Sequence, residues 1–233
     1  MKAVILAGGL GERLRPFTQA IPKPLLPIGE QSLLELQISN LAENGVDEVF
    51  VATNYKSKYI ENFIGDGSRL GVKITFSEEE QPLGTCGPLS LLRDQLTEPF
   101  IMLNGDILTT LHFRRFYDFG VAQASDFTVA TKNIRTPFNF GSVECRGDQI
   151  VKVEEKPDFV MEIVAGIYLI KPVLLELVPD NESYGVDTLM AQMLAEGRPI
   201  TRYLMDEFWL DIGALEDYND AEEAYRTHFE KGG

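Results

Sequence analysis

Residues 1–28, MKAVILAGGLGERLRPFTQAIPKPLLPI, run from a hydrophobic segment through a glycine-rich turn into a basic and proline-rich segment. The apolar residues at 4–7 predict a short buried strand. The glycines at 8–11 lack Cβ atoms, so the backbone N–H groups there can approach the phosphates of a ligand. Arg13 and Lys23 follow with positive charge, and a guanidinium can hold phosphoryl oxygens in a bidentate manner. This order of strand, glycine turn and cations predicts a phosphate-binding site.

Two named glycine motifs are excluded by the residues that follow. A P-loop ends in Lys-Ser or Lys-Thr, whereas Gly9 is followed by Leu-Gly-Glu-Arg. A dinucleotide fingerprint that starts at Gly9 requires a glycine at position 14, where the sequence has Leu14. Taken alone, the glycines also fit an ordinary turn that joins a strand to a loop in an α/β fold.

The composition fits one acidic globular domain. The chain has 233 residues, of which 44% are hydrophobic, enough for the core of one large α/β domain. Its net charge is 21 − 36 = −15, so long-range attraction to nucleic acid or to an anionic bilayer is not expected. The binding of anionic substrates would therefore depend on a local cluster of cations and a metal ion.

The cysteines and the N-terminus give no sign of secretion. Cys86 and Cys145 lie far apart and match neither a disulfide framework nor a zinc motif. Residues 1–10 do not resemble a signal peptide, and no segment reaches the length of a membrane span. We expect a soluble, cytoplasmic protein with reduced thiols that binds neither nucleic acid nor a membrane.

Strand and helix patterns alternate along the first half of the chain. Ser32 is a candidate N-cap for a helix that ends at Asn44-Gly45. The elements expected after it are a strand at 47–54, a helix near 56–64, a strand at 72–77, a helix from about 86 to 96 and a strand at 100–104. This alternation predicts a doubly wound α/β fold with a mostly parallel sheet covered on both faces.

The second half is richer in predicted strands. They are expected at 127–133, 141–146, 149–157 and 164–170, with a turn at Gly147-Asp148 that indicates a hairpin. A terminal helix is predicted at 215–229. We therefore predict a single domain over 1–233, in which a part at about 1–110 precedes a part at about 111–233 that contains a small β-rich region and the C-terminal helix.

The N-terminal string resembles the signature of the sugar-1-phosphate nucleotidyltransferases, or NDP-sugar pyrophosphorylases, L-A-G-G-x-G-x-R-L-x-P-x-T-x-x-x-P-K-P-L-L-P-I. Further stretches follow in that family's order: PLGTCG at 82–87, LNGD at 103–106, FG at 140–141, EEKP at 154–157, AGIYLI at 165–170 and WLDIG at 209–213. The resemblance covers nearly the whole chain. It implies a Rossmann-like nucleotide-diphospho-sugar transferase fold whose first part binds the nucleotide and whose second part binds the sugar phosphate. The appended left-handed β-helix of some relatives does not follow, so acyltransfer is not expected.

The implied reaction joins a nucleoside triphosphate (NTP) to a sugar 1-phosphate and releases pyrophosphate. Like charges must be brought together, so catalysis depends on positioning and on neutralisation by Arg, Lys, backbone N–H groups and Mg²⁺. Asp106 follows an apolar segment, which places it where ligands bind at the strand ends of a parallel sheet. Resemblance places Asp106 and Asp211 at the magnesium ion, which needs few protein carboxylates. Taken singly, these residues also fit a helix N-cap and a turn.

The resemblance also assigns roles to individual residues. Arg13, Lys23 and Asp106 are catalytic in this assignment, and the two cations neutralise phosphate charge. The nucleotide-binding residues are Leu6, Ala7, Gly8, Gly9, Gly11, Arg13, Gln81, Gly84, Thr85 and Gly87. The sugar-phosphate-binding residues are Asn104, Gly141, Glu155, Lys156 and Gly166. The structural alternatives are solvated surface cations, a turn that leads into a helix, and an exposed hairpin end.

The segments PKPLLPI and PLGTCG look closer to mannose- or heptose-1-phosphate guanylyltransferases than to thymidylyltransferases. Phe140 stands where tyrosine is common in the family and Val164 where asparagine is frequent, which leaves a sugar other than glucose or N-acetylglucosamine open. Thymidylyl, uridylyl and cytidylyl transfer are the alternatives within the class. A catalytically silent, nucleotide-sugar-binding regulatory subunit is the alternative outside it, although its expected mark, loss of the arginine or the metal aspartates, is not found. A homo-oligomer is compatible with the sequence but is not defined by it.

Overall fold

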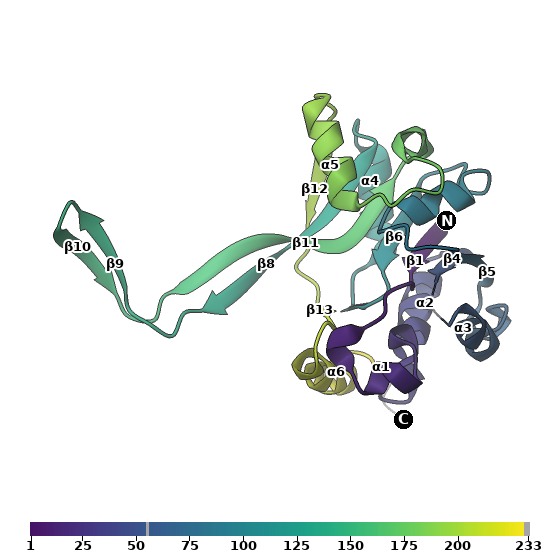
Figure 1. Cartoon of the computed structure of the whole chain (residues 1–233), viewed down its shortest axis with the longest axis horizontal. Helices are drawn as coiled ribbons and strands as arrows, with labels where there is room; N and C mark the ends of the chain where they lie inside the picture. Colours follow the sequence, from purple (N-terminus) through teal and green to yellow (C-terminus); the bar gives the residue numbers. More distant parts are fainter. Residues whose placement is uncertain (55, 231–233) are drawn as a thin grey trace.

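The central sheet has seven strands in the order β12-β8-β11-β6-β1-β4-β5 in the computed structural model, which describes residues 1–54 and 56–230 (Figure 1). The strands are β1 (Lys2–Leu6), β4 (Glu48–Thr53), β5 (Lys73–Glu78), β6 (Phe100–Asn104), β8 (Phe127–Pro137), β11 (Asp158–Ile170) and β12 (Ile200–Leu204). Strand β11 is antiparallel to both of its neighbours, and the other pairs are parallel. The predicted α/β fold with a mostly parallel sheet is confirmed.

Both faces of the sheet are covered, which explains why the interior positions of its central strands are apolar. In β1, Ala3 and Ile5 belong to one buried cluster and Val4 belongs to the other, as the period-two alternation of a strand requires. The first cluster includes residues of α2 (Leu33–Glu43), α3 (Ser57–Ile64) and α4 (Phe113–Ala122). The second includes residues of α5 (Val186–Ala195) and of two 3-10 helices, Gly87–Leu92 and Pro172–Leu177.

Local signals set several element boundaries. Ser32 caps α2 through a reciprocal pair: its Oγ accepts the Glu35 N–H, and the Glu35 carboxylate accepts the Ser32 N–H at 2.8 Å. The predicted terminal helix is α6 (Leu215–His228). The helix predicted from about 86 to 96 is wrong in type and length, because the segment forms the short 3-10 helix Gly87–Leu92.

Short elements frame the end of the sheet where the parallel strands terminate. They are the helix α1 (Phe17–Ala20), the hairpin of β2 (Pro27–Ile28) with β3 (Gln31–Ser32), and the antiparallel pair of β7 (Ile107–Thr109) with β13 (Trp209–Asp211). The β7–β13 pair joins the segment after β6 to the chain just before α6. Residues from both ends of the sequence therefore meet at this edge.

Strands β8 and β11 continue past the sheet as a two-stranded projection (Figure 1). The predicted hairpin is present beyond it, as β9 (Ser142–Arg146) and β10 (Gln149–Glu154). Only the sheet-side halves of β8 and β11 are buried, and β10 is exposed throughout. The β-rich part of the second half thus forms an arm that extends away from the body.

Candidate active site

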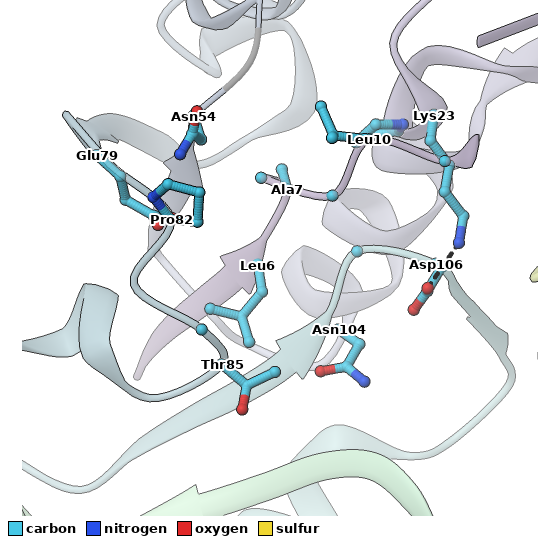
Figure 2. Close-up of a pocket in the computed structure, with 16 residues that line it drawn as sticks. Leu6, Ala7, Leu10, Lys23, Asn54, Glu79, Pro82, Thr85, Asn104 and Asp106 are labelled. Carbon is cyan, nitrogen blue, oxygen red and sulfur yellow. Dashed lines mark hydrogen bonds and ion pairs between the residues drawn. The ribbon is translucent and has the colours of Figure 1, made fainter. Parts of the chain in front are cut away.

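A cavity of about 530 Å³ lies at the carboxyl ends of β1 and β6 (Figure 2). Its lining includes most of the glycine-rich turn after β1 and the segment after β6, as expected for a ligand crevice in a parallel sheet. Of the residues assigned from sequence, it is lined by Leu6, Ala7, Gly8, Gly9, Gly11, Lys23, Gly84, Thr85, Asn104 and Asp106. The N-terminal string therefore folds around one concave surface.

The turn that carries Asp106 is fixed from two sides. Gly105 donates its N–H to the Leu6 carbonyl at 2.9 Å, and a Cβ at position 105 would lie only 2.5 Å from that oxygen. Gln37 donates its side-chain amide to the carbonyls of Asn104 and Ile107, at 3.0 and 2.8 Å. Close strand contact on one side and a buried amide on the other hold the aspartate at the cavity wall.

Lys23 and Asp106, which both line the cavity, form an ion pair (Figure 2). Lys23 Nζ lies 2.6 Å from Asp106 Oδ2. The lysine is only 8% exposed and stands between two prolines in the 3-10 helix Lys23–Leu25, which limits its freedom. Since a buried ammonium needs a counter-charge, the pairing explains how this cation is retained inside the protein.

Asp211 reaches the same place through the β7–β13 pair. It is paired with Ile107, and the next residue, Ile212, donates its N–H to the Asp106 carbonyl at 2.9 Å. Burial and the negative charge of Asp106 raise the pKa of Asp211. Asp211 is exposed by its accessible surface, but it lines a cavity with Arg13, Gly213 and Asp217, and this partial enclosure is the burial that acts on its carboxyl.

Arg13 completes the cluster. Its guanidinium nitrogens lie 2.9 and 3.1 Å from where a Cβ on Gly213 would stand, directly after the β13 segment. The charges of Arg13 and Lys23 both act to lower the pKa of Asp211, which shows that all four charged groups share one neighbourhood. Segments near 13, 23, 106 and 211 are thus gathered at one edge of the sheet.

The donor set of this cluster suits magnesium. Lys23 occupies Oδ2 of Asp106, so Oδ1 and the Asp211 carboxylate are the oxygens left to face a cation. Within residues 1–54 and 56–230 no group of three or more His, Cys, Asp or Glu side chains could hold a metal. Two carboxylates are nevertheless in keeping with Mg²⁺, which usually takes its other ligands from water and substrate phosphates.

The far wall of the cavity carries Glu79, a residue that the sequence interpretation missed. One carboxylate oxygen accepts the Leu83 N–H at 2.9 Å, and the other lies 3.2 Å from the Cβ position of Gly8. Glu79 is buried, and this burial raises the pKa of its carboxyl. The remaining lining residues that were not assigned are Leu10, Pro24, Asn54, Pro82 and Gly105. The position of Glu79 just after a predicted strand, and just before PLGTCG, is the signal that could have indicated it.

Three residues assigned to nucleotide binding do not line this cavity. Arg13 lines a neighbouring cavity together with Asp211, and Gln81 and Gly87 point elsewhere. The Gln81 side chain is exposed and donates to the Asn181 carbonyl at 2.9 Å. Gly87 is buried, donates its N–H to the Tyr184 carbonyl at 3.0 Å, and has Glu182 O only 2.7 Å from its Cβ position. Gly87 therefore serves the packing of the turn against the 182–184 segment, which also explains the tight 3-10 geometry there.

The residues assigned to the sugar phosphate are split between two places. Asn104 and Gly166 meet: Gly166 has φ +69°, and its Cβ position lies 2.8 Å from Asn104 Nδ2. Asn104 Oδ1 is buried and has no hydrogen-bond partner among the described residues. Gly141, Glu155 and Lys156, by contrast, flank the β9–β10 hairpin at the end of the arm. The structure does not bring these three to the cavity, because β8 and β11, after a register shift between Val164 and Tyr168, stay paired out to Pro137–Asp158 and carry them outward.

The cysteines take no part in the cluster. Cys86 is buried, and burial raises the pKa of its thiol to about 12, which disfavours a thiolate nucleophile. Cys145 is exposed on the arm. None of the described helices has both the length and the apolar character of a membrane span.

Comparisons with known proteins find relatives over nearly the whole chain. The family described as Nucleotidyl transferase matches residues 2–228. Mannose-1-phosphate guanylyltransferase 1 of Arabidopsis thaliana is 35% identical over 227 residues, which cover 94% of this chain and 63% of that protein. The chain thus spans a little under two thirds of the length of this curated relative.

Solved structures share the fold over nearly the whole chain. A Bacillus anthracis protein described as a candidate glucose-1-phosphate thymidylyltransferase, in complex with a sucrose, has a TM-score of 0.81 at 25% identity and covers 100% of this chain and 98% of its own. HddC from Yersinia pseudotuberculosis, complexed with GMP-PN, has a TM-score of 0.72 at 25% identity and covers 96% of this chain and 99% of its own.

Proposed function

Because this chain belongs to the nucleotidyl transferase family, we propose that it transfers a nucleotidyl group from an NTP to a sugar 1-phosphate, giving an NDP-sugar and pyrophosphate. The observation that carries the proposal is the convergence of two cations and two carboxylates, Arg13, Lys23, Asp106 and Asp211, beside the glycine-lined cavity. The favoured substrates are GTP with mannose 1-phosphate or heptose 1-phosphate. A relative named mannose-1-phosphate guanylyltransferase supports this preference.

The proposed chemistry is an in-line displacement. An oxygen of the sugar phosphate forms a bond to the α-phosphorus, and the bond from that phosphorus to the β-phosphate bridging oxygen breaks, so its electron pair leaves with pyrophosphate. Arg13 and Lys23 neutralise the phosphate charges that approach one another and orient them. Asp106 and Asp211 would hold Mg²⁺, which when bound supplies further charge neutralisation and a template for the phosphates.

Glu79 supports the choice of guanine. An ionised carboxylate only accepts hydrogen bonds, and the Watson–Crick edge of guanine presents two adjacent donors, the ring N1–H and the N2 amino group. Uracil and thymine present a single donor between two acceptors, which would face the carboxylate unfavourably. A buried group built to pair with a base edge discriminates strongly, because the wrong base leaves it unpaired.

A silent regulatory subunit is the alternative of a different class. Such a subunit would be free to lose its catalytic charges, whereas this chain retains all four and places them together. We therefore favour the enzyme. The free thiols Cys86 and Cys145 are in keeping with action in a reducing cytoplasm.

The test is a matrix of the four NTPs against the 1-phosphates of mannose, glucose, N-acetylhexosamine, N-acetylmuramic acid and heptose, with and without MgCl₂, scored by pyrophosphate release. We expect the highest rate with GTP plus mannose or heptose 1-phosphate, and only in the presence of magnesium. Asp106→Asn is the control that must remove the signal. Nucleotide binding without release for every pair would overturn the proposal and favour the silent subunit.

A further inference from the structure

Asn54 lines the glycine-lined cavity beside Glu79. It is the first residue after β4, just as Glu79 is the first residue after β5. Figure 2 shows both side chains on the same wall, with the amide nitrogen of Asn54 on the side of Glu79 and Pro82. The Cβ position of Gly8 lies 3.2 Å from Glu79 Oε1 and 3.5 Å from Asn54 Cβ. The amide and the carboxylate are therefore neighbours.

The ends of three strands hold these two side chains in place. Strand β4 pairs in parallel with both β1 and β5. Ala7 donates its N–H to the Ala52 carbonyl at 2.7 Å, and Glu79 donates its N–H to the Thr53 carbonyl at 2.8 Å. The backbone is thus hydrogen-bonded up to the cavity wall. Side chains that strand ends position in this way lose little freedom when a ligand binds.

Both side chains keep hydrogen-bonding groups for a ligand. Asn54 is half-buried, and its side-chain amide has no hydrogen-bond partner within residues 1–54 and 56–230. Glu79 uses Oε2 to accept the Leu83 N–H, which leaves Oε1 on the side of Gly8. Enclosing a polar group without a partner is unfavourable unless a ligand or water supplies one. The wall therefore offers an amide donor next to a carboxylate acceptor.

The other side-chain donors of the cavity have different partners. The lining side chains that carry N–H or O–H groups are Asn54, Lys23, Thr85 and Asn104. Lys23 is held in its ion pair. Thr85 Oγ accepts the Val186 N–H at 2.7 Å, and Asn104 lies against β11. Asn54 is thus the side-chain donor that stands with Glu79.

A donor beside an acceptor complements one particular base edge. Guanine presents the O6 acceptor next to its N1–H and N2 amino donors. Glu79 accepts from the two donors in the proposed function, so O6 needs a donor from another residue, and leaving it unpaired would weaken binding. Adenine carries an amino group at C6 and an acceptor at N1, so N1 would face the carboxylate whichever way the Asn54 amide turns.

We propose that Asn54 donates its side-chain amide to O6 of guanine and, together with Glu79, selects this base. The inference rests on the proposed function for the identity of the ligand, a guanine nucleotide. It concerns binding of the base and not the displacement at phosphorus. Asn54 is therefore a specificity-determining residue, and its loss should depend on which groups the base carries.

The experiment measures nucleotide binding by calorimetry without sugar 1-phosphate, so that no transfer occurs. The nucleotides are GTP, inosine triphosphate, which lacks the N2 amino group but keeps O6, and 2-aminopurine riboside triphosphate, which keeps the amino group but lacks O6. Asn54→Ala should weaken binding of the first two by about tenfold each and leave the third unchanged. An equal loss for all three would overturn the proposal, because Asn54 would then act on the fold or on the phosphates.

Asn219→Ala is the matched control. Asn219 is an exposed amide on α6 that lines none of the cavities described here, so its removal should change no nucleotide affinity. The wild-type protein gives a test that needs no variant. It should bind 7-deaza-GTP, which keeps O6 and lacks N7, as tightly as GTP, and the 2-aminopurine nucleotide at least tenfold more weakly. A selective loss with 7-deaza-GTP would show that the base is recognised at N7, and would refute the contact to O6.

Failure of this inference can be told apart from failure of the proposed function. If the protein binds GTP with the expected pattern of analogues but releases no pyrophosphate with any sugar 1-phosphate, the transfer reaction is lost and the role of Asn54 stands. If pyrophosphate is released from UTP or dTTP in preference to GTP, nucleotidyl transfer stands and guanine selection by Asn54 is refuted.

Discussion

The Lys23–Asp106 ion pair offers a sharp test of the site, because its loss should lower kcat by a larger factor than it lowers the free energy of unfolding. Lys23→Met removes the ammonium and keeps the side-chain volume. It leaves the Asp106 carboxylate without its partner at 2.6 Å. Since the proposed role of Lys23 is to neutralise the reacting phosphates, the loss should be larger in kcat than in folding stability.

The expected magnitudes follow from burial. Losing one partner of a fully buried pair costs about 3–5 kcal/mol, but the Asp106 side chain is 29% exposed and water can replace part of the interaction, so we expect about 1–2 kcal/mol. For a chain of this size that lowers Tm by about 3–6 °C. Removing a donor that stabilises charge in the transition state costs about 10²- to 10³-fold in kcat.

The assay combines thermal denaturation by circular dichroism with pyrophosphate release at saturating substrates. The double variant Lys23→Met/Asp106→Asn should be destabilised by about 1 kcal/mol less than the sum of the two single variants, since it leaves no unpaired charge. Its activity should not recover. Lys73→Met is the matched control: its partner Glu48 lies at 2.7 Å, but Lys73 is 71% exposed, so its loss should cost less than about 1 kcal/mol and leave turnover unchanged. A Lys23→Met enzyme within about threefold of the wild-type rate would refute the proposed role.

Three further predictions concern Glu79, Asp211 and Gly105. Glu79→Gln should lower kcat/KM for GTP while sparing the other NTPs. Burial raises the pKa of Glu79, so this group stabilises the fold below its ordinary pKa, and that stability is lost as pH rises through the folded pKa. The Glu79→Gln variant should therefore have a higher Tm than wild type at about pH 8 but not at about pH 4. A lower Tm at the higher pH would contradict the reasoning. Asp211→Asn should abolish magnesium-dependent pyrophosphate release. Its Tm above neutral pH should equal or exceed that of wild type, because the pKa of Asp211 is also raised. An active variant would exclude Asp211 from the metal site. Gly105→Ala should cost about 1–3 kcal/mol in urea unfolding because its Cβ would meet the Leu6 carbonyl at 2.5 Å, and unchanged stability would show that the turn is not tightly held.

Much of the fold and half of the site were accessible from the sequence because their signals are local. The alternation of apolar strands and helices defines the sheet. The start of α2 is set by a signal only four residues long, the capping pair of Ser32 and Glu35. The glycine turn and Asp106 lie directly after predicted strands, so their place at the strand ends followed from the fold class. The helix at about 86–96 was wrong because a tertiary contact, that of Gly87 with the 182–184 segment, overrides the local pattern.

What the amino-acid sequence determined by itself is the order of elements and the chemistry of the turn after β1, since both depend on neighbouring residues. Only the tertiary structure decided which distant groups meet. Asp211 joins Asp106 through the pairing of β13 with β7, and Glu79 lies against Gly8 in the cavity lining, contacts that no local period encodes. The arm is the strongest case. Its strand pattern is plain in the sequence, but whether it folds back or projects depends on how far β8 and β11 stay paired, a cooperative choice made by the whole sheet rather than by any residue within the arm.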